Sequence, residues 1–261
     1  RHSDVGNSLS SRQGWSFFSI IYSHLFSFLD RLGALYIYFV TAGTNWYFFL
    51  LVGTPGSGKS MLAARLPGIL PELSPSEALE TSMVHSRAGM IDSGGISRSR
   101  PYRSPHHTAS MAAIVGGGKG ALPGEISLAH NGVLFMDELP EFPGNVLETL
   151  RQPIETGDVT VARANAHVKY PCQFMLIAAA NPCKCGYLPD PARACARVPV
   201  CGQDYLGRIS GPLMDRFDLR VEVPPVSFSD LGQDAPKGEA SQFVAARVAA
   251  ARARQTDRYA G

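Results

Sequence analysis

A glycine-rich loop, GTPGSGKS at positions 53–60, has the residue types and spacing of a phosphate-binding loop. It follows an apolar run that predicts a strand and precedes a segment with helical character. The glycines let the backbone wrap around a phosphate chain, and the helix N-terminus supplies N–H donors. We expect Lys59 to reach the β and γ phosphates of a nucleotide and Ser60 to bind Mg²⁺. The predicted nucleotide-binding residues are Gly53, Thr54, Pro55, Gly56, Ser57, Gly58, Lys59, Ser60 and Met61.

An acidic pair, Asp137 and Glu138, comes directly after a second apolar run, GVLFM. A carboxylate at a strand end can hold Mg²⁺, often through water, and its neighbour can polarise an attacking water. A solvated strand end would carry the same two residues. Because a phosphate loop lies upstream, we interpret Asp137 as a Mg²⁺ ligand and Glu138 as a catalytic residue.

Four cysteines, Cys183, Cys185, Cys195 and Cys201, follow a third apolar run, FMLIAAA. Four thiolates are the number that a closed tetrahedral Zn²⁺ site needs, although C-x-C is tighter than the usual spacing. No His lies between positions 168 and 261, so an open, catalytic zinc is not favoured. We expect a structural zinc, with free or redox-active thiols and an iron–sulfur cluster as alternatives. Cys172 is expected to be a small core residue.

The segment between the phosphate loop and the acidic pair includes a loop rich in Gly and Ser. This loop carries four basic residues that we expect to contact DNA: Arg98, Arg100, Arg103 and Lys119. Such a loop can line the pore of a ring and contact a phosphate backbone. The alternative is a solvated loop in which His106 and His107 cap a helix that begins near Pro105.

The composition bounds the remaining choices. A chain of 261 residues can bury a sizeable core, as one large domain or a domain and a half. Hydrophobic residues make up 45%, charged residues 18%, and the formal net charge is +2, which excludes intrinsic disorder and a strongly polyanion-seeking protein. The clustered cysteines favour a reducing compartment, so we expect a cytoplasmic protein.

The first 46 residues are rich in aromatics and begin with neither Met nor a basic region, so a secretory signal is not expected. The stretch Leu32–Leu51 lacks charge and is long enough to span a bilayer as a helix. Its last six residues, however, must form the strand that leads into the phosphate loop. We therefore expect no membrane partner and leave residues 1–46 unassigned.

Apolar runs at 47–52, 132–137, 174–180 and 219–223 predict strands, and the segments 60–66, 74–85 and 145–155 have helical character. This alternation predicts an α/β fold with a central parallel sheet flanked by helices. Residues 158–171 alternate with period two around Ala164 and Asn165, which predicts a hairpin added to that sheet. After a linker, residues 241–259 predict one terminal helix.

The chain resembles the AAA+ ATPases related to the magnesium chelatase ATPase subunit, and most of all their YifB/ComM branch. The resemblance runs from about Leu51 to Pro225, with a weaker echo in the final helix. It implies a P-loop AAA+ core that uses ATP and Mg²⁺ and assembles into a homo-oligomeric ring, a hexamer. Four segments carry the resemblance: RSPHHTAS, VGGGKGALPGEISLAHNGVLFMDELPEF, AAANPCKCGY and RISGPLMDRFDLRVEVP.

Members of the ComM type are DNA helicases that promote branch migration during natural transformation. The resemblance therefore implies an ATP-hydrolysing motor that acts on single-stranded or branched DNA. Asn181 matches the first sensor, which positions the water or the γ-phosphate, and Arg216 matches the arginine finger that a neighbouring subunit receives. A guanidinium offered in trans stabilises charge on the transferring phosphoryl group. Arg208 is the alternative finger.

The resemblance predicts an AAA+ ATPase domain over residues 47–225, preceded by the unassigned leader at 1–46. Residues 226–261 are predicted to be a linker and the first helix of an incomplete lid domain. The leader does not match the ribosomal S5/Lon-type domain of ComM-like proteins. Two alternative functions remain open: a magnesium chelatase ATPase subunit that acts through a partner, and an ATP-binding module without turnover. The cysteine cluster favours the YifB/ComM branch over the chelatase.

Overall fold

The computed structural model describes residues 46–91, 95–118, 120–163, 166–226 and 239–259. Residues 43–237 form one compact unit, and residues 238–261 belong to a second, so each is described by itself. The predicted leader therefore lies, except for Trp46, outside the described residues. The predicted domain boundaries stay predictions.

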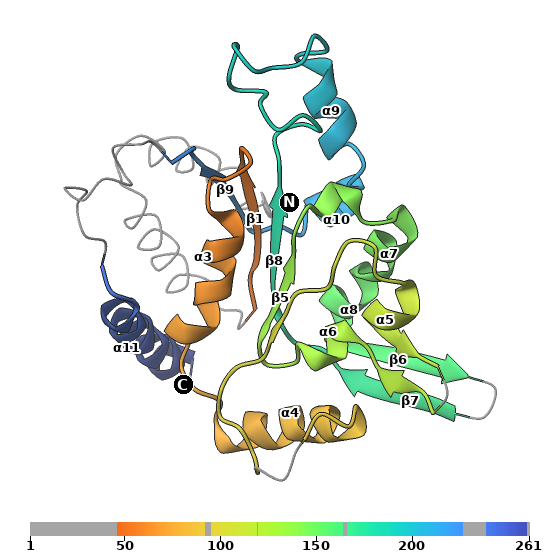
Figure 1. The fold of residues 1–261 in the computed structure, drawn as a ribbon. Coiled ribbons are helices and arrows are strands. Elements are labelled where there is room, and N and C mark those ends of the chain that lie inside the picture. The colour runs from red at the N-terminus through yellow and green to blue at the C-terminus, as the bar shows by residue number, and fades with distance from the viewer. Residues whose placement is uncertain (1–45, 92–94, 119, 164–165, 227–238, 260–261) are drawn as a thin grey trace, which may run out of the picture. The chain divides into compact units, whose positions relative to one another are not determined.

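A five-stranded parallel sheet forms the centre of the first unit (Figure 1). Its strand order is β2-β5-β8-β1-β9, which confirms the predicted fold class. Four of the strands match the predicted runs, whereas β2, which has only two residues, was not predicted. The strands are β1 (Phe48–Gly53), β2 (Tyr102–Arg103), β5 (Val133–Met136), β8 (Met175–Ala180) and β9 (Leu219–Val223).

β5 and β8, which lie side by side inside the sheet, are buried at every position. This burial explains why both strands read as continuous apolar runs, because helices cover both faces of a parallel sheet. The helices are α3 (Lys59–Arg65), η2 (Leu66–Ile69), α4 (Pro75–Arg87), α5 (Met111–Val115), α6 (Glu125–Leu128), η3 (Leu139–Glu141), α7 (Gly144–Thr149), α8 (Arg151–Thr156), α9 (Val200–Leu206) and α10 (Gly211–Met214).

The helix boundaries follow local signals. α4 begins with a capping box, in which Ser74 Oγ accepts from the backbone N–H of Glu77 and the Glu77 side chain accepts from that of Ser74. The predicted single helix at 145–155 is two helices, α7 and α8, which meet at the fully buried Leu150. The helix near Pro105 that belonged to the alternative interpretation of the basic loop does not form, because α5 begins at Met111 with Ser110 as its N-cap.

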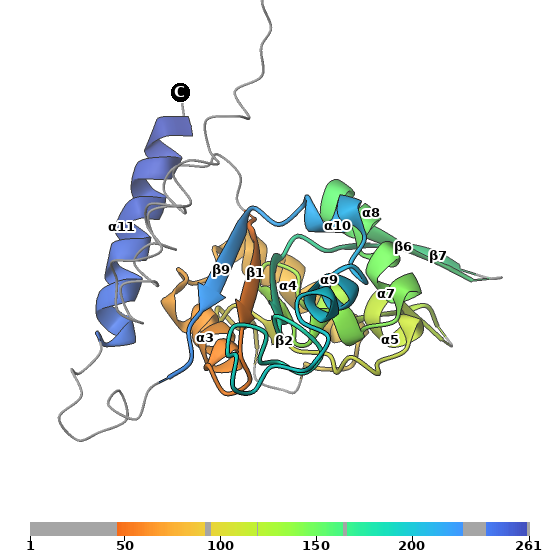
Figure 2. The same ribbon diagram turned by 90° about the horizontal axis from the view of Figure 1, so that it is seen from above.

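The predicted hairpin forms from β6 (Asp158–Arg163) and β7 (Ala166–Pro171), and its turn residues lie outside the described part of the chain. Its predicted place in the main sheet is wrong, because β6 and β7 make a separate two-stranded sheet that extends outward (Figures 1 and 2). The buried Val161 packs in the core, and Tyr170 Oη donates to Ala121 O at 2.7 Å. Ala121 lies in the loop between β3 (Gly116–Gly117) and β4 (Leu122–Pro123). The hairpin is therefore held by side-chain contacts and not by a sheet edge.

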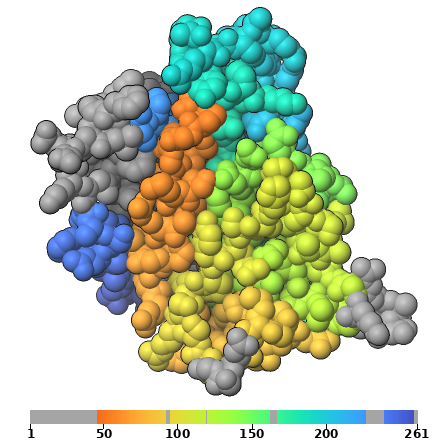
Figure 3. Space-filling view, in the orientation of Figure 1, coloured from red at the N-terminus to blue at the C-terminus, as the bar shows by residue number. Residues whose placement is uncertain are grey.

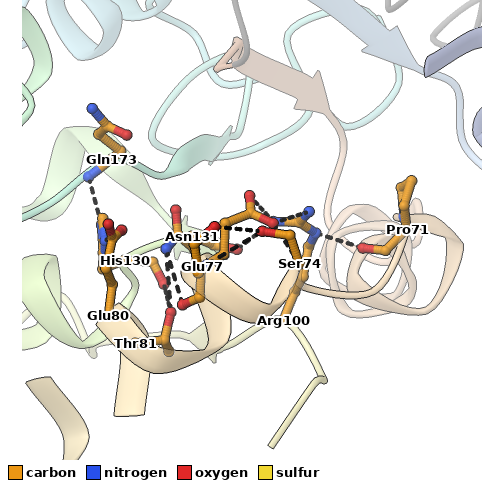
Figure 4. Close-up of polar contacts among 10 residues, drawn as sticks. Pro71, Ser74, Glu77, Glu80, Thr81, Arg100, His130, Asn131 and Gln173 are labelled. Carbon is orange, nitrogen blue, oxygen red and sulfur yellow. Dashed lines mark hydrogen bonds and ion pairs between the residues drawn. The ribbon is translucent and has the colours of Figure 1, made fainter. Parts of the chain in front are cut away.

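A polar network joins α4 to the residues before β5 (Figure 4). Arg100 donates to Pro71 O at 2.6 Å and to Asn131 O at 2.8 Å, and it pairs with Glu77 at 3.4 Å. Asn131 Nδ2 in turn lies 3.3 Å from Thr81 Oγ1. Because these donors and acceptors are largely shielded from water, the network fixes α4 against the sheet.

His130 extends this network and is almost fully buried. Its Nδ1 accepts from the backbone N–H of Gln173 at 3.2 Å, and its Nε2 lies 3.3 Å from Glu80 Oε2. Burial lowers the pKa of His130, although Glu80 and Glu77 oppose the effect. The imidazole therefore favours its neutral form in the folded protein.

The second unit contributes the helix α11 (Ser241–Tyr259), which confirms the predicted terminal helix. Its Arg247 pairs with Glu239 through two contacts of 2.6 Å. Across the described residues, none of the helices is both long and apolar enough to cross a membrane. Residues 32–45 of the uncharged stretch lie outside the described residues, and 48–51 are part of β1.

Candidate active site

The phosphate loop connects β1 to α3, as predicted. Gly56 and Gly58 adopt left-handed backbone conformations, with φ of 77° and 86°, which favour glycine. Gly53 is required for a different reason, because a Cβ there would lie 2.4 Å from Val223 O and 2.7 Å from Ser57 Oγ. The loop can therefore take this path only with glycine at these positions.

Lys59 lies inside the loop and is 8% exposed. Its Nζ donates to the carbonyl oxygens of Gly53 and Thr54, at 2.7 and 3.0 Å, and to Asn181 Oδ1 at 3.1 Å. Burial lowers the pKa of Lys59, while the neighbouring carboxylates raise it. The predicted sensor residue thus lies beside the predicted phosphate-binding lysine.

Ser60 and Asp137, the two predicted Mg²⁺ ligands, are in contact. Ser60 Oγ donates to Asp137 Oδ2 at 2.7 Å, and Asp137 Oδ1 accepts from the backbone N–H of Glu138 at 2.9 Å. A hydroxyl and a carboxylate oxygen are ligands that Mg²⁺ takes in nucleotide sites. Ser60 is exposed and Asp137 is half-buried, and the donor set fits this ion.

The rest of the loop also fits a phosphate chain. Thr54 Oγ1 and Ser57 Oγ are buried and have no hydrogen-bond partner among the described residues, so the loop has unused polar atoms. Pro55 and Gly56 are exposed at the tip of the loop. Met61, on the first turn of α3, is 56% exposed.

Glu138 has a left-handed backbone conformation, with φ of 52° and ψ of 47°. Such a conformation is costly for a residue other than glycine and is typical of functional sites. Its Oε2 lies 3.4 Å from His107 Nδ1. His107 was not predicted at this site, because β2 is too short to be recognised in the sequence and its pairing with β5 brings the two residues together.

The two candidate arginine fingers each pair with a glutamate of the same unit. Arg216 pairs with Glu155 on α8. Arg208 pairs with Glu141 at 3.2 Å, and its guanidinium lies 5.9 Å from the centre of the Tyr205 ring. Both side chains are about half exposed, so each can be offered to a neighbouring subunit.

The four predicted DNA-contacting residues have different surroundings. Arg100 is held, half-buried, in the polar network described above, and Arg103 makes two contacts of 2.6 Å with Glu125. Arg98 is exposed, and Lys119 lies outside the described residues. The positive charges of Arg100 and Arg103 thus stabilise the fold, and their surroundings do not favour the predicted phosphate contacts.

The four clustered thiols come together in the segment that links β8 to α9 and in the first turn of α9. Cys183 Sγ lies 2.9 Å from Cys185 Sγ. Hydrogen bonds, foremost from Cys183, lower the pKa of Cys185 to about 6. Burial and contacts with Cys195 and Cys183 raise the pKa of Cys201 to about 12.

This thiol arrangement does not fit the predicted zinc site. Sulfur ligands at about 2.3 Å from a tetrahedral Zn²⁺ lie roughly 3.8 Å apart, whereas Cys183 and Cys185 approach to 2.9 Å. Within the described ranges, no group of three or more His, Cys, Asp or Glu side chains is arranged to hold a metal ion. The same contact is too long for a disulfide bond, so the cysteines are free. Cys172 is buried, as predicted for a core residue.

The cysteine segment contacts the phosphate loop. A Cβ on Gly186 would lie 2.6 Å from the Pro55 ring, so the two backbones approach closely only because residue 186 is glycine. In the space-filling view the cysteine segment (cyan) borders the phosphate loop (orange) (Figure 3). The segment therefore forms one wall of the loop.

Comparisons with known proteins agree with this geometry. The family model "Magnesium chelatase, subunit ChlI" matches residues 37–231. YifB of Salmonella typhimurium is 50% identical over 206 residues, which cover 79% of this chain and 40% of YifB. Competence protein ComM of Haemophilus influenzae is 45% identical over 217 residues, which cover 83% of this chain and 42% of ComM. The chain spans about two-fifths of the length of these relatives.

More distant relatives include the magnesium-chelatase 38 kDa subunit of Rhodobacter capsulatus, 24% identical over 67% of this chain and 48% of that subunit. A solved model of the complex between subunits BchI and BchD of magnesium chelatase matches with a TM-score of 0.50 and 21% identity. The match covers 87% of this chain and 66% of the matched chain, and it supports the fold described above. The chain belongs to the magnesium chelatase ChlI family of AAA+ proteins and, within it, to the YifB/ComM group.

Proposed function

We propose that the chain is the ATP-hydrolysing core of an AAA+ motor that acts on DNA. The observation that carries the proposal is the convergence of Lys59, Ser60, Asp137 and Asn181 at the carboxyl ends of β1, β5 and β8. A buried lysine, a hydroxyl, a carboxylate and an amide at one edge of a parallel sheet suit phosphoryl transfer from a nucleotide.

The proposed mechanism assigns one role to each residue. Lys59 exchanges its two loop carbonyls for the β and γ phosphates of ATP. Ser60 and Asp137 hold Mg²⁺, which neutralises charge on the phosphates when it is bound. Glu138 accepts a proton from the attacking water, and Asn181 orients that water.

Assembly completes the proposed site. Arg216 leaves its ion pair with Glu155 and enters the nucleotide site of a neighbouring subunit, where its charge stabilises the transition state. The proposed assembly is a homo-oligomeric ring, a hexamer, and hydrolysis then depends on its formation. Arg208, which is held by Glu141, is the second candidate for this role.

DNA is the proposed substrate of the motor. The 45% identity to a protein named for competence supports this choice, as does the exposed Arg98 on the loop before β2. We propose that the motor acts on single-stranded or branched DNA and promotes branch migration during transformation or recombination, with Arg98 and Lys119 as phosphate contacts. Five free cysteines support a reducing, cytoplasmic location.

A magnesium chelatase ATPase subunit is the second candidate, because the matched family model carries that name. The 24% identity to a chelatase subunit is much lower than the 50% identity to YifB, which favours the DNA motor. An ATP-binding module without turnover is the third candidate.

The three candidate functions can be distinguished by phosphate release from Mg·ATP, measured with and without forked DNA. Lys59→Ala serves as the inactive variant, and Arg65→Ala is a matched control, because Arg65 is an exposed cation in the last turn of the same helix. We expect forked DNA to stimulate release in the wild type and in Arg65→Ala, and not in Lys59→Ala. Release that DNA leaves unchanged would favour the chelatase. Bound nucleotide without release would favour the binding module.

A further inference from the structure

The loop between β2 and α5 lies beside the acidic pair because of strand register. β2 pairs with β5 in parallel, with Tyr102 opposite Val133 and Arg103 opposite Leu134. The residues that follow β2 therefore emerge at the same edge of the sheet as the residues that follow β5. The two segments are far apart in the sequence, so their proximity becomes apparent only in the folded chain.

His107 lies in this loop and contacts Glu138. Its Nδ1 lies 3.4 Å from Glu138 Oε2. The ring is held on two sides, since its centre is 4.1 Å from that of His106 and 6.4 Å from that of Phe142, whose ring it meets at 79°. A ring packed in this way holds its nitrogen in a defined direction.

The neighbouring His106 does not share this role. Its Nδ1 lies 2.8 Å from Thr108 Oγ1 and accepts from the backbone N–H of Thr108 at 3.3 Å. His106 therefore stabilises the turn of the loop and supports the His107 ring from one side.

Glu138 needs an orienting partner. Its side chain is 48% exposed, so without a contact the carboxylate would sample several rotamers. A general base is effective only when it is held within reach of the water it deprotonates. The partner that the structure provides is His107.

We propose that His107 is a positioning residue for ATP hydrolysis. Its Nδ1–H holds Oε2 of Glu138, so that Oε1 stays available to accept a proton from the attacking water. This inference rests on the proposed ATPase function, in which Glu138 is the base. It also links the loop of Arg98 to the chemical step, because β2 connects that loop to the segment of His107.

The first test is steady-state hydrolysis of Mg·ATP by His107→Ala and His107→Asn. We expect His107→Ala to lower kcat about tenfold and to leave KM for ATP within about twofold, because the phosphate loop is unchanged. The asparagine amide places an N–H near the position of Nδ1, so His107→Asn should recover most of kcat. His167→Ala, an exposed histidine of β7, is the matched control and should behave as the wild type.

An unchanged kcat in His107→Ala, or an equal loss in His107→Asn, would overturn the inference. These results are distinct from failure of the proposed function, which would appear as absence of release from the wild type itself. A second measurement does not depend on turnover: the ring ¹⁵N resonances of His107, assigned by their loss in His107→Asn. We expect Glu138→Gln to shift these resonances. Unchanged resonances would show that His107 does not contact Glu138 in solution and would overturn the inference.

Discussion

Ser60 Oγ donates a hydrogen bond to Asp137 Oδ2 at 2.7 Å across 77 positions of sequence. Ser60 follows β1 and Asp137 follows β5, and β8 lies between these strands in the sheet. The bond therefore spans the end of β8, where Asn181 contacts Lys59 at 3.1 Å. Three neighbouring strands thus each contribute to one site, which explains why the site depends on the register of the sheet.

The close contact of Gly53 with β9 predicts a loss of stability in Gly53→Ala. The new Cβ would approach Val223 O to 2.4 Å, and a backbone carbonyl of the sheet cannot move aside easily. We expect a cost of about 1–3 kcal/mol, measured by urea unfolding. Gly68→Ala is the matched control, because a Cβ there meets nothing within 4 Å. Equal stabilities of the two variants would contradict the account of this turn.

Buried His130 predicts that acid weakens the fold. Burial lowers the pKa of His130, so the unfolded chain binds a proton more readily than the folded one. The stability contribution is then present above the unfolded pKa of about 6.5 and is lost as the pH falls through the folded pKa. We expect Tm to fall between about pH 7.5 and 5.5, and His130→Gln to show a shallower fall.

His167→Gln tests whether this dependence belongs to the buried ring. His167 is exposed on β7, so its removal should leave the pH dependence of Tm as in the wild type. If Tm of His130→Gln fell with pH as steeply as Tm of the wild type, a group other than His130 would be responsible for the pH dependence.

The fold was largely predictable because its strands are uninterrupted apolar runs. The buried runs that became β5 and β8 could only be inner strands of a covered parallel sheet. The hairpin at 158–171 was predicted correctly. The alternation of apolar and polar residues along it, however, indicates only that one face is buried and does not indicate which residues cover that face. The core positions of Val159 and Val161 could be seen only in the folded chain.

The low pKa of Cys185 predicts selective alkylation. Because this pKa is about 6, the thiolate predominates at neutral pH, and the rate of labelling by iodoacetamide should fall as the pH drops through about 6. Cys172, whose pKa is raised to about 12 by burial, should remain unlabelled. Cys185→Ser should remove the fast phase. A fast phase that persists in this variant would assign the reactive thiol to another cysteine.

The site residues were predictable where a local motif carries the chemistry and less so where contacts are distant. Lys59, Ser60 and Asp137 follow from short patterns at strand ends. The pairing of Arg100 depends instead on Pro71 and Asn131, which are far from it in sequence. A basic residue in a Gly- and Ser-rich loop therefore gives no sign of whether its charge is free or paired.

Arg98 provides the test of DNA contact by the loop. Because Arg98 is exposed, Arg98→Ala should leave the free energy of unfolding within about 0.5 kcal/mol of the wild type. Its affinity for forked DNA should fall, and the slope of log K against log salt should decrease by about 1. Arg100→Ala, by contrast, should cost about 2–3 kcal/mol of stability, because it leaves buried acceptors unpaired. Unchanged DNA affinity and slope in Arg98→Ala would exclude a phosphate contact by this residue.

The most direct test of the central claim is phosphate release from Mg·ATP by Glu138→Gln, measured beside ATP binding. Glutamine keeps the shape of the side chain but cannot accept the proton of the attacking water. We predict that ATP still binds with an affinity close to that of the wild type, while release falls at least about 100-fold. Release at the wild-type rate in Glu138→Gln would contradict the account.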